Sequence, residues 1–256
     1  LYKFIRQGED GEFISSEFKP AFSLTSDVKL KATRIGKRVA ELYIDPLSAK
    51  FIIDNIGVKN DLGYLTIICQ CMEMQPTLRV KSSEDIESSL INMNIKVPDV
   101  WDLEYEDFLA AFKTALMFRD WASEIGEDKL LDKYNIAPGE LYTKTLNAEW
   151  MVYAARELAM LLNKNNTANN LNKLRLRIKY GVRKELLELV ALRGIGRARA
   201  RLLWNNGIRK ISTLKATEND KIEKILGSKL AKQIIDQIRE DQYEKFQKLK
   251  LKNRRE

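Results

Sequence analysis

The chain has 256 residues, of which 45% are hydrophobic, and this is enough for the cores of two or three small domains. No apolar run is long enough to cross a membrane, and no signal-peptide pattern opens the chain, so we expect a cytoplasmic protein without membrane contact. The net charge of +8 indicates a polyanionic partner.

The sequence lacks the residues of most catalytic and metal sites. It contains no histidine, which removes the usual general base and any Ser–His or Cys–His nucleophile pair. Gly36-Lys37 lacks the earlier glycine of a phosphate loop, and Cys69 and Cys71 form a lone Cys-x-Cys that is more simply two positions of a helix. We therefore expect no catalytic residue, no cofactor site and no metal site in this chain. Because it begins at Leu1 without Met, we interpret it as part of a larger protein.

The N-terminal part predicts a small helical unit. Residues 1–31 are mixed and predict a strand or loops. Thr33 can cap a helix that continues to Leu42, and a second helix begins at Pro46. Tyr43 should be extended on the way to that proline. Two short helices joined in this way suit a winged-helix-like unit.

The middle of the chain alternates helices with short loops. We expect helices at residues 61–76, 82–94, 104–125 and 128–134, the third of them ended by Gly126. The Asn-rich run at 163–172 predicts an exposed loop. This alternation is typical of a helical bundle.

The longest predicted helix runs from Pro138 to Asn163 and carries two contrasting stripes. The apolar stripe has 4, 3, 4 spacing and consists of Met151, Ala155, Leu158 and Leu162. The second stripe is small or polar except for one tryptophan, and consists of Thr143, Asn147, Trp150, Ala154 and Glu157.

Trp150 on this second stripe has two interpretations. Its ring could stack on a nucleic-acid base, or it could be buried against a neighbouring domain. Glu157 argues against the first, because a carboxylate repels phosphate, and the nearest cations, Lys144 and Arg156, lie off the stripe. Taken alone, the stripe favours the buried ring.

Positive charge is concentrated near the C-terminus. Between Leu171 and Ile211 there are twelve Lys or Arg and only two Glu, a net charge of +10 that leaves −2 for the rest of the chain. A basic region of this kind is typical of a nucleic-acid-binding surface. A membrane surface is the competing partner, but the segment lacks a clean amphipathic helix.

A helix-hairpin-helix is the strongest local motif, at Glu185 to Gly207. Apolar residues before Gly194-Ile195-Gly196 predict one helix, and those after it a second. The glycines permit a tight turn near a phosphate, Ile195 plugs the core, and the second helix directs free N–H groups at the same place. The predicted phosphate-contacting residues are Arg193, Gly194, Ile195, Gly196, Arg197, Arg199 and Arg201. Residues 226–229 resemble a degenerate second hairpin that supplies packing.

Three stretches together resemble one family. They are LKATRIGKRVAELYIDPLSAKFI, FKTALMFRDWASEIGEDKLLDKYNIAPGELYTKTLNAEWMVYAARELA and RIKYGVRKELLELVALRGIGRARARLLWNNGIRKI. In this order they resemble the C-terminal half of archaeal superfamily-two DNA helicases of the Hjm type, relatives of the helicase part of DNA polymerase theta. The resemblance covers most of the chain from about Leu30 to Arg239.

The resemblance implies a mainly α architecture. It divides the chain into a winged helix (1–60, not necessarily complete), a helical ratchet domain (61–179), a helix-hairpin-helix domain (180–245) and a basic tail (246–256). Two RecA-like motor domains, which use ATP and Mg, precede these parts in the family and are missing from this chain, so the chain alone should have no ATPase activity. The implied parent is a monomeric 3′→5′ helicase that unwinds branched DNA at stalled forks.

The resemblance also assigns roles on the long helix. Trp150 matches the tryptophan that stacks on a base of the single strand, which makes stacking the favoured interpretation. Thr143 stands where the family has an arginine, so Lys144 would have to replace that contact. Arg197, Arg199 and Arg201 match the segment that touches the emerging 3′ tail and restrains translocation.

Three alternatives remain open. The first is a stand-alone helix-hairpin-helix protein that binds single-stranded or branched DNA without a motor. The second is a helix-hairpin-helix glycosylase, ranked last because its required aspartate could only be Asp220, in a polar turn. The third is an RNA-helicase relative, which shares the winged-helix and ratchet pattern.

Overall fold

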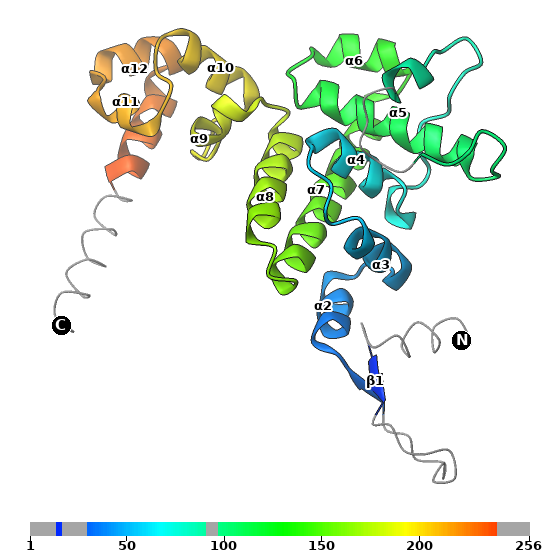
Figure 1. Cartoon of the computed structure of the whole chain (residues 1–256). Coiled ribbons are helices and arrows are strands. Elements are labelled where there is room, and N and C mark those ends of the chain that lie inside the picture. The colour runs from blue at the N-terminus through cyan, green and yellow to red at the C-terminus, as the bar shows by residue number, and fades with distance from the viewer. Residues whose placement is uncertain (1–13, 17–29, 91–96, 240–256) are drawn as a thin grey trace, which may run out of the picture. The chain divides into compact units, whose positions relative to one another are not determined.

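Helices make up most of the part of the chain that the computed structural model describes, residues 14–16, 30–90 and 97–239 (Figure 1). The chain divides into two compact units. The first unit comprises Leu1–Asp120 and Gly126–Arg175, and the second comprises Trp121–Ile125 and Leu176–Glu256. The predicted mainly α fold class is therefore confirmed.

The first unit begins with a short antiparallel pair, β1 (Ile14–Ser16) and β2 (Leu30–Ala32), with Ile14 opposite Ala32. Its helices, in order, are α2 (Arg34–Leu42), α3 (Pro46–Asp54), α4 (Asp61–Cys69), η2 (Met72–Met74), η3 (Glu87–Leu90), α5 (Tyr105–Trp121), α6 (Glu127–Tyr134), α7 (Pro138–Leu161) and the start of α8 (Asn165–Tyr180). Helix α7 packs against α2, α3, α4 and η2. The winged-helix assignment of residues 1–60 stays a prediction, and the described residues of this range share a compact unit with the helices that follow.

Local sequence explains where several helices begin. The hydroxyl of Thr33 accepts a hydrogen bond from the Gly36 N–H at 3.0 Å, as predicted for the start of α2. The carboxylate of Asp45 accepts from the Leu47 N–H at 2.7 Å, with Pro46 in the first turn of α3. Tyr43 corrects one expectation: its φ of 56° is left-handed, because it caps the C-terminus of α2.

The Asn-rich run at 163–172 is helical, so the predicted exposed loop is wrong. Asn163 makes the turn after α7 with a φ of 58°, and α8 begins two residues later. The helix forms because it buries an apolar face, consisting of Ala168, Leu171, Leu174 and Ile178. This 3, 3, 4 spacing outweighs the low helix propensity of asparagine.

Three other predicted helices are shorter than expected. The helix expected at 61–76 ends at Cys69, and the 3-10 turn Met72–Met74 follows it. In place of a helix at 82–94, the described part holds only the 3-10 turn Glu87–Leu90, and residues 91–96 lie outside it. Helix α5 ends at Trp121, four residues early, and Gly126 is instead the N-cap residue of α6. The predicted basic tail, 246–256, lies outside the described residues.

The second unit holds a run of short helices. They are the end of α8, η4 (Lys184–Leu186), α9 (Leu187–Val190), α10 (Arg197–Asn205), α11 (Ile211–Ala216), α12 (Asn219–Leu226) and a helical stretch at 228–239. Its core includes Leu189, Ile195, Leu203 and Ile234, all at most 2% exposed. Residues 226–229 form a second turn, with Gly227 at a φ of 83°. Leu226 packs against the core, and Gly227, Ser228 and Lys229 are exposed. No helix in the described part is both long and apolar enough to span a bilayer.

Candidate nucleic-acid interface

The two stripes of α7 face different surroundings. On the apolar stripe, Met151, Ala155 and Leu158 are at most 1% exposed, as predicted. On the second stripe, Thr143 is exposed, Asn147 and Trp150 are half-buried, and Ala154 is fully buried. The second stripe therefore lies at the edge of the core, and its N-terminal part reaches the surface.

Trp150 is anchored at one end. Its indole Nε1 donates a hydrogen bond to the carbonyl oxygen of Leu42, at the end of α2, at 3.0 Å. The ring is neither fully buried nor fully exposed. A hydrogen bond from the indole N–H to the protein holds the ring in one orientation. This orientation is compatible with a platform on which a base stacks and also with a ring that packs in the core.

Thr143 and Lys144 differ sharply in accessibility. Thr143 is exposed, and its hydroxyl donates to the Gly139 carbonyl at 3.0 Å within the helix. Lys144 is 6% exposed, its Nζ donates to the Pro76 carbonyl, and Glu140 lies 3.5 Å away. A buried ammonium that already has a carbonyl and a carboxylate partner would have to leave both of them to contact a strand. Lys144 is therefore poorly placed to replace the missing arginine.

Glu157 is not the isolated negative charge that the sequence indicated. Its Oε2 is 2.6 Å from Arg38 of α2, and its Oε1 is 2.6 Å from Arg156. Hydrogen bonds to Glu41 and Glu157 raise the pKa of Arg38 above its ordinary value, so this guanidinium stays charged. The objection that Glu157 would repel phosphate is thus removed. Sequence reasoning missed Arg38 because its partner is 119 positions away.

The glycine turn of the hairpin has the predicted geometry. Gly194 has a φ of 81°, and a Cβ there would lie 2.9 Å from Leu230 Cδ1. Ile195 is 2% exposed in the core of the second unit. Gly196 is the N-cap residue of α10. Because glycine has no side chain, it cannot accept a hydrogen bond from the first N–H groups of that helix. Such a turn can accept an anion.

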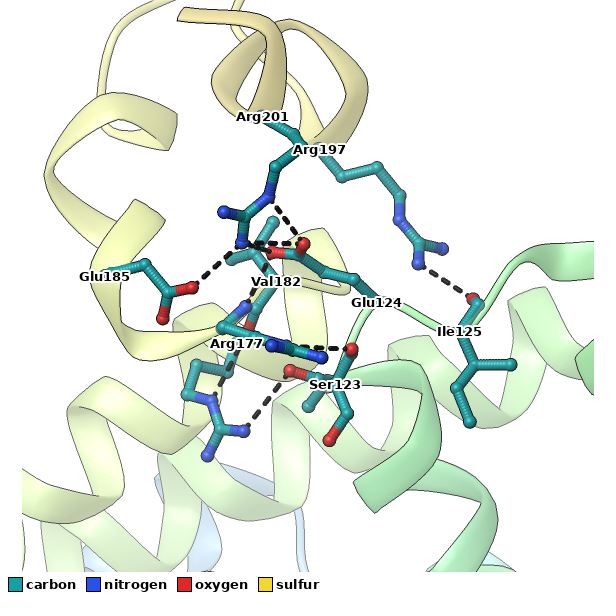
Figure 2. A network of polar contacts seen from close by, with 10 residues as sticks. Ser123, Glu124, Ile125, Arg177, Val182, Glu185, Arg197 and Arg201 are labelled. Carbon is teal, nitrogen blue, oxygen red and sulfur yellow. Dashed lines mark hydrogen bonds and ion pairs between the residues drawn. The ribbon is translucent and has the colours of Figure 1, made fainter. Parts of the chain in front are cut away.

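The arginines around this turn fall into two groups. Arg193 and Arg199 are exposed, and the Arg199 side chain donates to the Gly194 carbonyl at 2.8 Å. Arg197 and Arg201 point elsewhere, toward residues 121–125 (Figure 2). The three arginines that the sequence placed in one anion site are thus divided between an exposed and an internal role.

Arg197 and Arg201 hold the segment Trp121–Ile125. Arg197 donates to the Ile125 carbonyl at 2.8 Å, and its guanidinium lies 4.5 Å from the centroid of a Trp121 ring (Figure 2). Arg201 bonds Glu124 through two nitrogens, at 2.8 and 2.9 Å. Arg201 also reaches Glu185 at 2.9 Å. These hydrogen bonds raise the pKa of Arg201.

Two more arginines bind the same segment. Arg183 donates through Nε to the Ser123 carbonyl at 3.1 Å, and its backbone N–H donates to Glu124. Arg177 donates to the carbonyls of Val182 and Ala122 at 3.3 and 3.2 Å. We call the four arginines that bind residues 121–125 (Arg177, Arg183, Arg197 and Arg201) the arginine clamp, and Figure 2 labels three of them, Arg177, Arg197 and Arg201. Sequence patterns did not indicate the clamp, because they predicted residues 121–125 to be helical.

Known families match both parts of this chain. The family "Archaeal helicase, domain 4" matches residues 62–181, and the family "SAM-like Helix-hairpin-helix tandem" matches residues 186–240. The second match is a tandem, in agreement with the second glycine turn at 226–229.

Curated relatives are similar over most of the chain. "ATP-dependent DNA helicase Hel308" of Methanocaldococcus jannaschii is 40% identical over 93% of this chain and 18% of its own length. The protein of the same name from Methanococcus vannielii is 39% identical over 83% of this chain and 29% of its own. That from Pyrococcus horikoshii is 34% identical over 84% and 31%. This chain therefore spans less than a third of the length of these relatives.

Proposed function

The chain belongs to the family of archaeal Hel308-type DNA helicases, and we propose that it is the DNA-guiding part of an ATP-dependent 3′→5′ helicase that acts on branched or stalled-fork DNA. In this proposal a single strand runs along the exposed stripe of α7, and the hairpin turn holds phosphates. The main support is Trp150, a half-buried ring fixed through its N–H. Glu157, seven residues further along the same stripe, is neutralised by two arginines.

The ring would act as a transient stop for the strand. Stacking of a base on an aromatic ring contributes about 1–3 kcal/mol, which is enough to bias stepping and small enough to permit release. Phosphate contacts at the hairpin turn would add affinity that falls as salt rises. ATP and Mg belong, in this proposal, to motor domains of the parent protein, because the residues present contain no phosphate loop.

The test compares two substitutions of Trp150 in binding to a fluorescent oligothymidylate. Trp150→Ala should weaken binding by the stacking energy without changing the salt dependence, whereas Trp150→Phe should retain most of the affinity. Both variants lose the hydrogen bond to Leu42, so a difference in binding between them is not caused by the loss of that bond. Equal affinity of the wild type and Trp150→Ala would assign Trp150 to the core.

The motor assignment has its own test. The chain by itself should show no DNA-stimulated ATP hydrolysis, and measured turnover would contradict the proposal that the motors lie elsewhere. A stand-alone DNA-binding protein is the second candidate, which the glycine turn alone would satisfy. Motor motifs in the reading frame upstream of Leu1 would distinguish the helicase part from this alternative.

A further inference from the structure

Five residues of the first unit form a cluster around one carboxylate. We call it the Glu157 cluster, and it consists of Arg38, Tyr153, Arg156, Glu157 and Arg175. Each oxygen of Glu157 bonds one arginine, at 2.6 Å. Tyr153 accepts from Arg38 at 3.5 Å and has the Arg175 guanidinium 5.5 Å from its ring centroid. The cluster therefore joins α2, α7 and α8 through three positive charges and one negative charge. The carboxylate of Glu41, 2.8 Å from Arg38, adds a second negative charge at its edge, so the positive charges still outnumber the negative ones.

The cluster offers more hydrogen-bond donors than it uses. A guanidinium has five N–H donors. Arg156 makes one hydrogen bond with another described residue, to Glu157. Arg38 makes three, to Glu41, Tyr153 and Glu157. The Nε of Arg175 is buried and has no acceptor within the described residues. An anion would satisfy this surplus.

The cluster is accessible and lies near Trp150. The side chains of Arg38 and Arg156 are 31% and 29% exposed. Glu157 follows Trp150 by seven residues on one stripe of α7, which places it roughly 10 Å along the helix. A strand stacked on Trp150 that continues toward the C-terminus of α7 would bring its backbone to the cluster.

We propose that Arg38 and Arg156, oriented by Glu157, form a phosphate-binding site for a single strand lying along α7, with Arg175 as a further cation at its edge. The site rests on the proposed function and deepens it. Glu157 acts as a positioning residue, because a carboxylate between two guanidiniums fixes their planes. Thr143, which precedes Trp150 on α7, provides no positive charge for the strand. The proposed site provides that charge on the C-terminal side of Trp150.

A double-mutant cycle tests whether Arg38 contacts phosphate or only neutralises Glu157. The variants are Arg38→Gln, Glu157→Gln and the double variant, with Arg79→Gln as the control. Arg79 is an exposed arginine of the same unit, so its loss removes the same charge. Binding of a fluorescent oligothymidylate is measured by anisotropy over a series of salt concentrations.

The site predicts a specific pattern of affinities. Arg38→Gln should reduce affinity about tenfold more than Arg79→Gln at low salt, since hydrogen bonds between charged groups are stronger than those between neutral groups. It should also reduce the salt slope by about one. The double variant should remain weaker than Glu157→Gln by a similar factor. Equal binding of the double variant and Glu157→Gln would overturn the proposal.

A second arginine keeps the test decisive if Arg38→Gln fails to fold. Arg156→Gln should show the same loss of slope, and binding equal to that of Arg79→Gln would overturn the site. If the wild-type chain binds no oligothymidylate, both the proposed function and the site fail. If Trp150→Ala weakens binding while the arginine variants match the control, only the site fails.

Discussion

In the first unit, three arginines gather around Glu157 of α7, and one of them, Arg38, also bonds Glu41. In the second unit, four arginines are directed at residues 121–125. In the Glu157 cluster, donors outnumber acceptors. In the arginine clamp, Arg201 is shared by two carboxylates and Arg197 is bound to a carbonyl and a ring. A count of positive charges therefore does not say which of them can meet a ligand. Part of the +10 charge of residues 171–211 belongs to arginines that bind other groups of the protein.

Gly181→Ala should destabilise the chain most, because it disrupts the clamp. Gly181 has a φ of 61°, and a Cβ there would lie 2.5 Å from Cε2 of Trp121. We expect a loss of about 3 kcal/mol in the free energy of unfolding from strain and overlap. Gly207→Ala is the control, with a φ of 84° and no atom within 4 Å of its Cβ, and should cost only about 1 kcal/mol. Equal losses in urea unfolding would show that the Trp121 contact is unimportant.

Arg201→Gln should destabilise the second unit by about 1–2 kcal/mol, because it leaves two partly buried carboxylates without their shared partner. Glu124→Gln should cost less, and the double variant should cost less than the sum. Thermal unfolding of the four proteins measures this coupling. Strict additivity would mean that the ion pair contributes nothing.

Arg199→Gln should affect binding more than stability, since Arg199 is exposed and its side chain bonds a backbone carbonyl of the turn. We expect the slope of affinity against salt concentration for single-stranded DNA to fall by about one. Arg201→Gln should change that slope less. The reverse order would show that ligand binding opens the clamp.

Protonation of Glu185 in acid should reduce folding stability by less than Gly181→Ala or Arg201→Gln does. Burial alone would raise the pKa of Glu185, but the hydrogen bond from Arg201 lowers it below its ordinary value. The resulting stabilisation is complete above about pH 4.3, the ordinary glutamate pKa, and is lost as the pH falls through the lower folded value. Glu185→Gln should therefore flatten the fall in stability below about pH 4.3. An unchanged pH profile would contradict this.

Much of the fold followed from local patterns. Thr33, Pro46 and Pro138 marked helix starts correctly because caps and N-terminal prolines act within one turn. The glycine turn at 194–196 was predictable for the same reason. Helix α8 was missed because the asparagines obscured its buried 3, 3, 4 stripe.

The site was less predictable than the fold. Trp150 could be selected as the aromatic residue on a polar stripe, but its bond to Leu42 spans 108 positions. The partners of Glu157 and the targets of Arg197 and Arg201 also depend on tertiary packing. No periodicity in a single sequence encodes such long-range pairs, so the sequence identified charges without assigning their use.

Photocrosslinking can establish directly whether a strand lies on α7 with a base against Trp150. The chain is irradiated with an oligonucleotide that carries 5-bromouracil, and the crosslinked peptides are identified by mass spectrometry. We expect an adduct on the peptide containing Trp150 that disappears in Trp150→Ala. Adducts confined to residues 193–210 of the hairpin unit would contradict the proposed path of the strand.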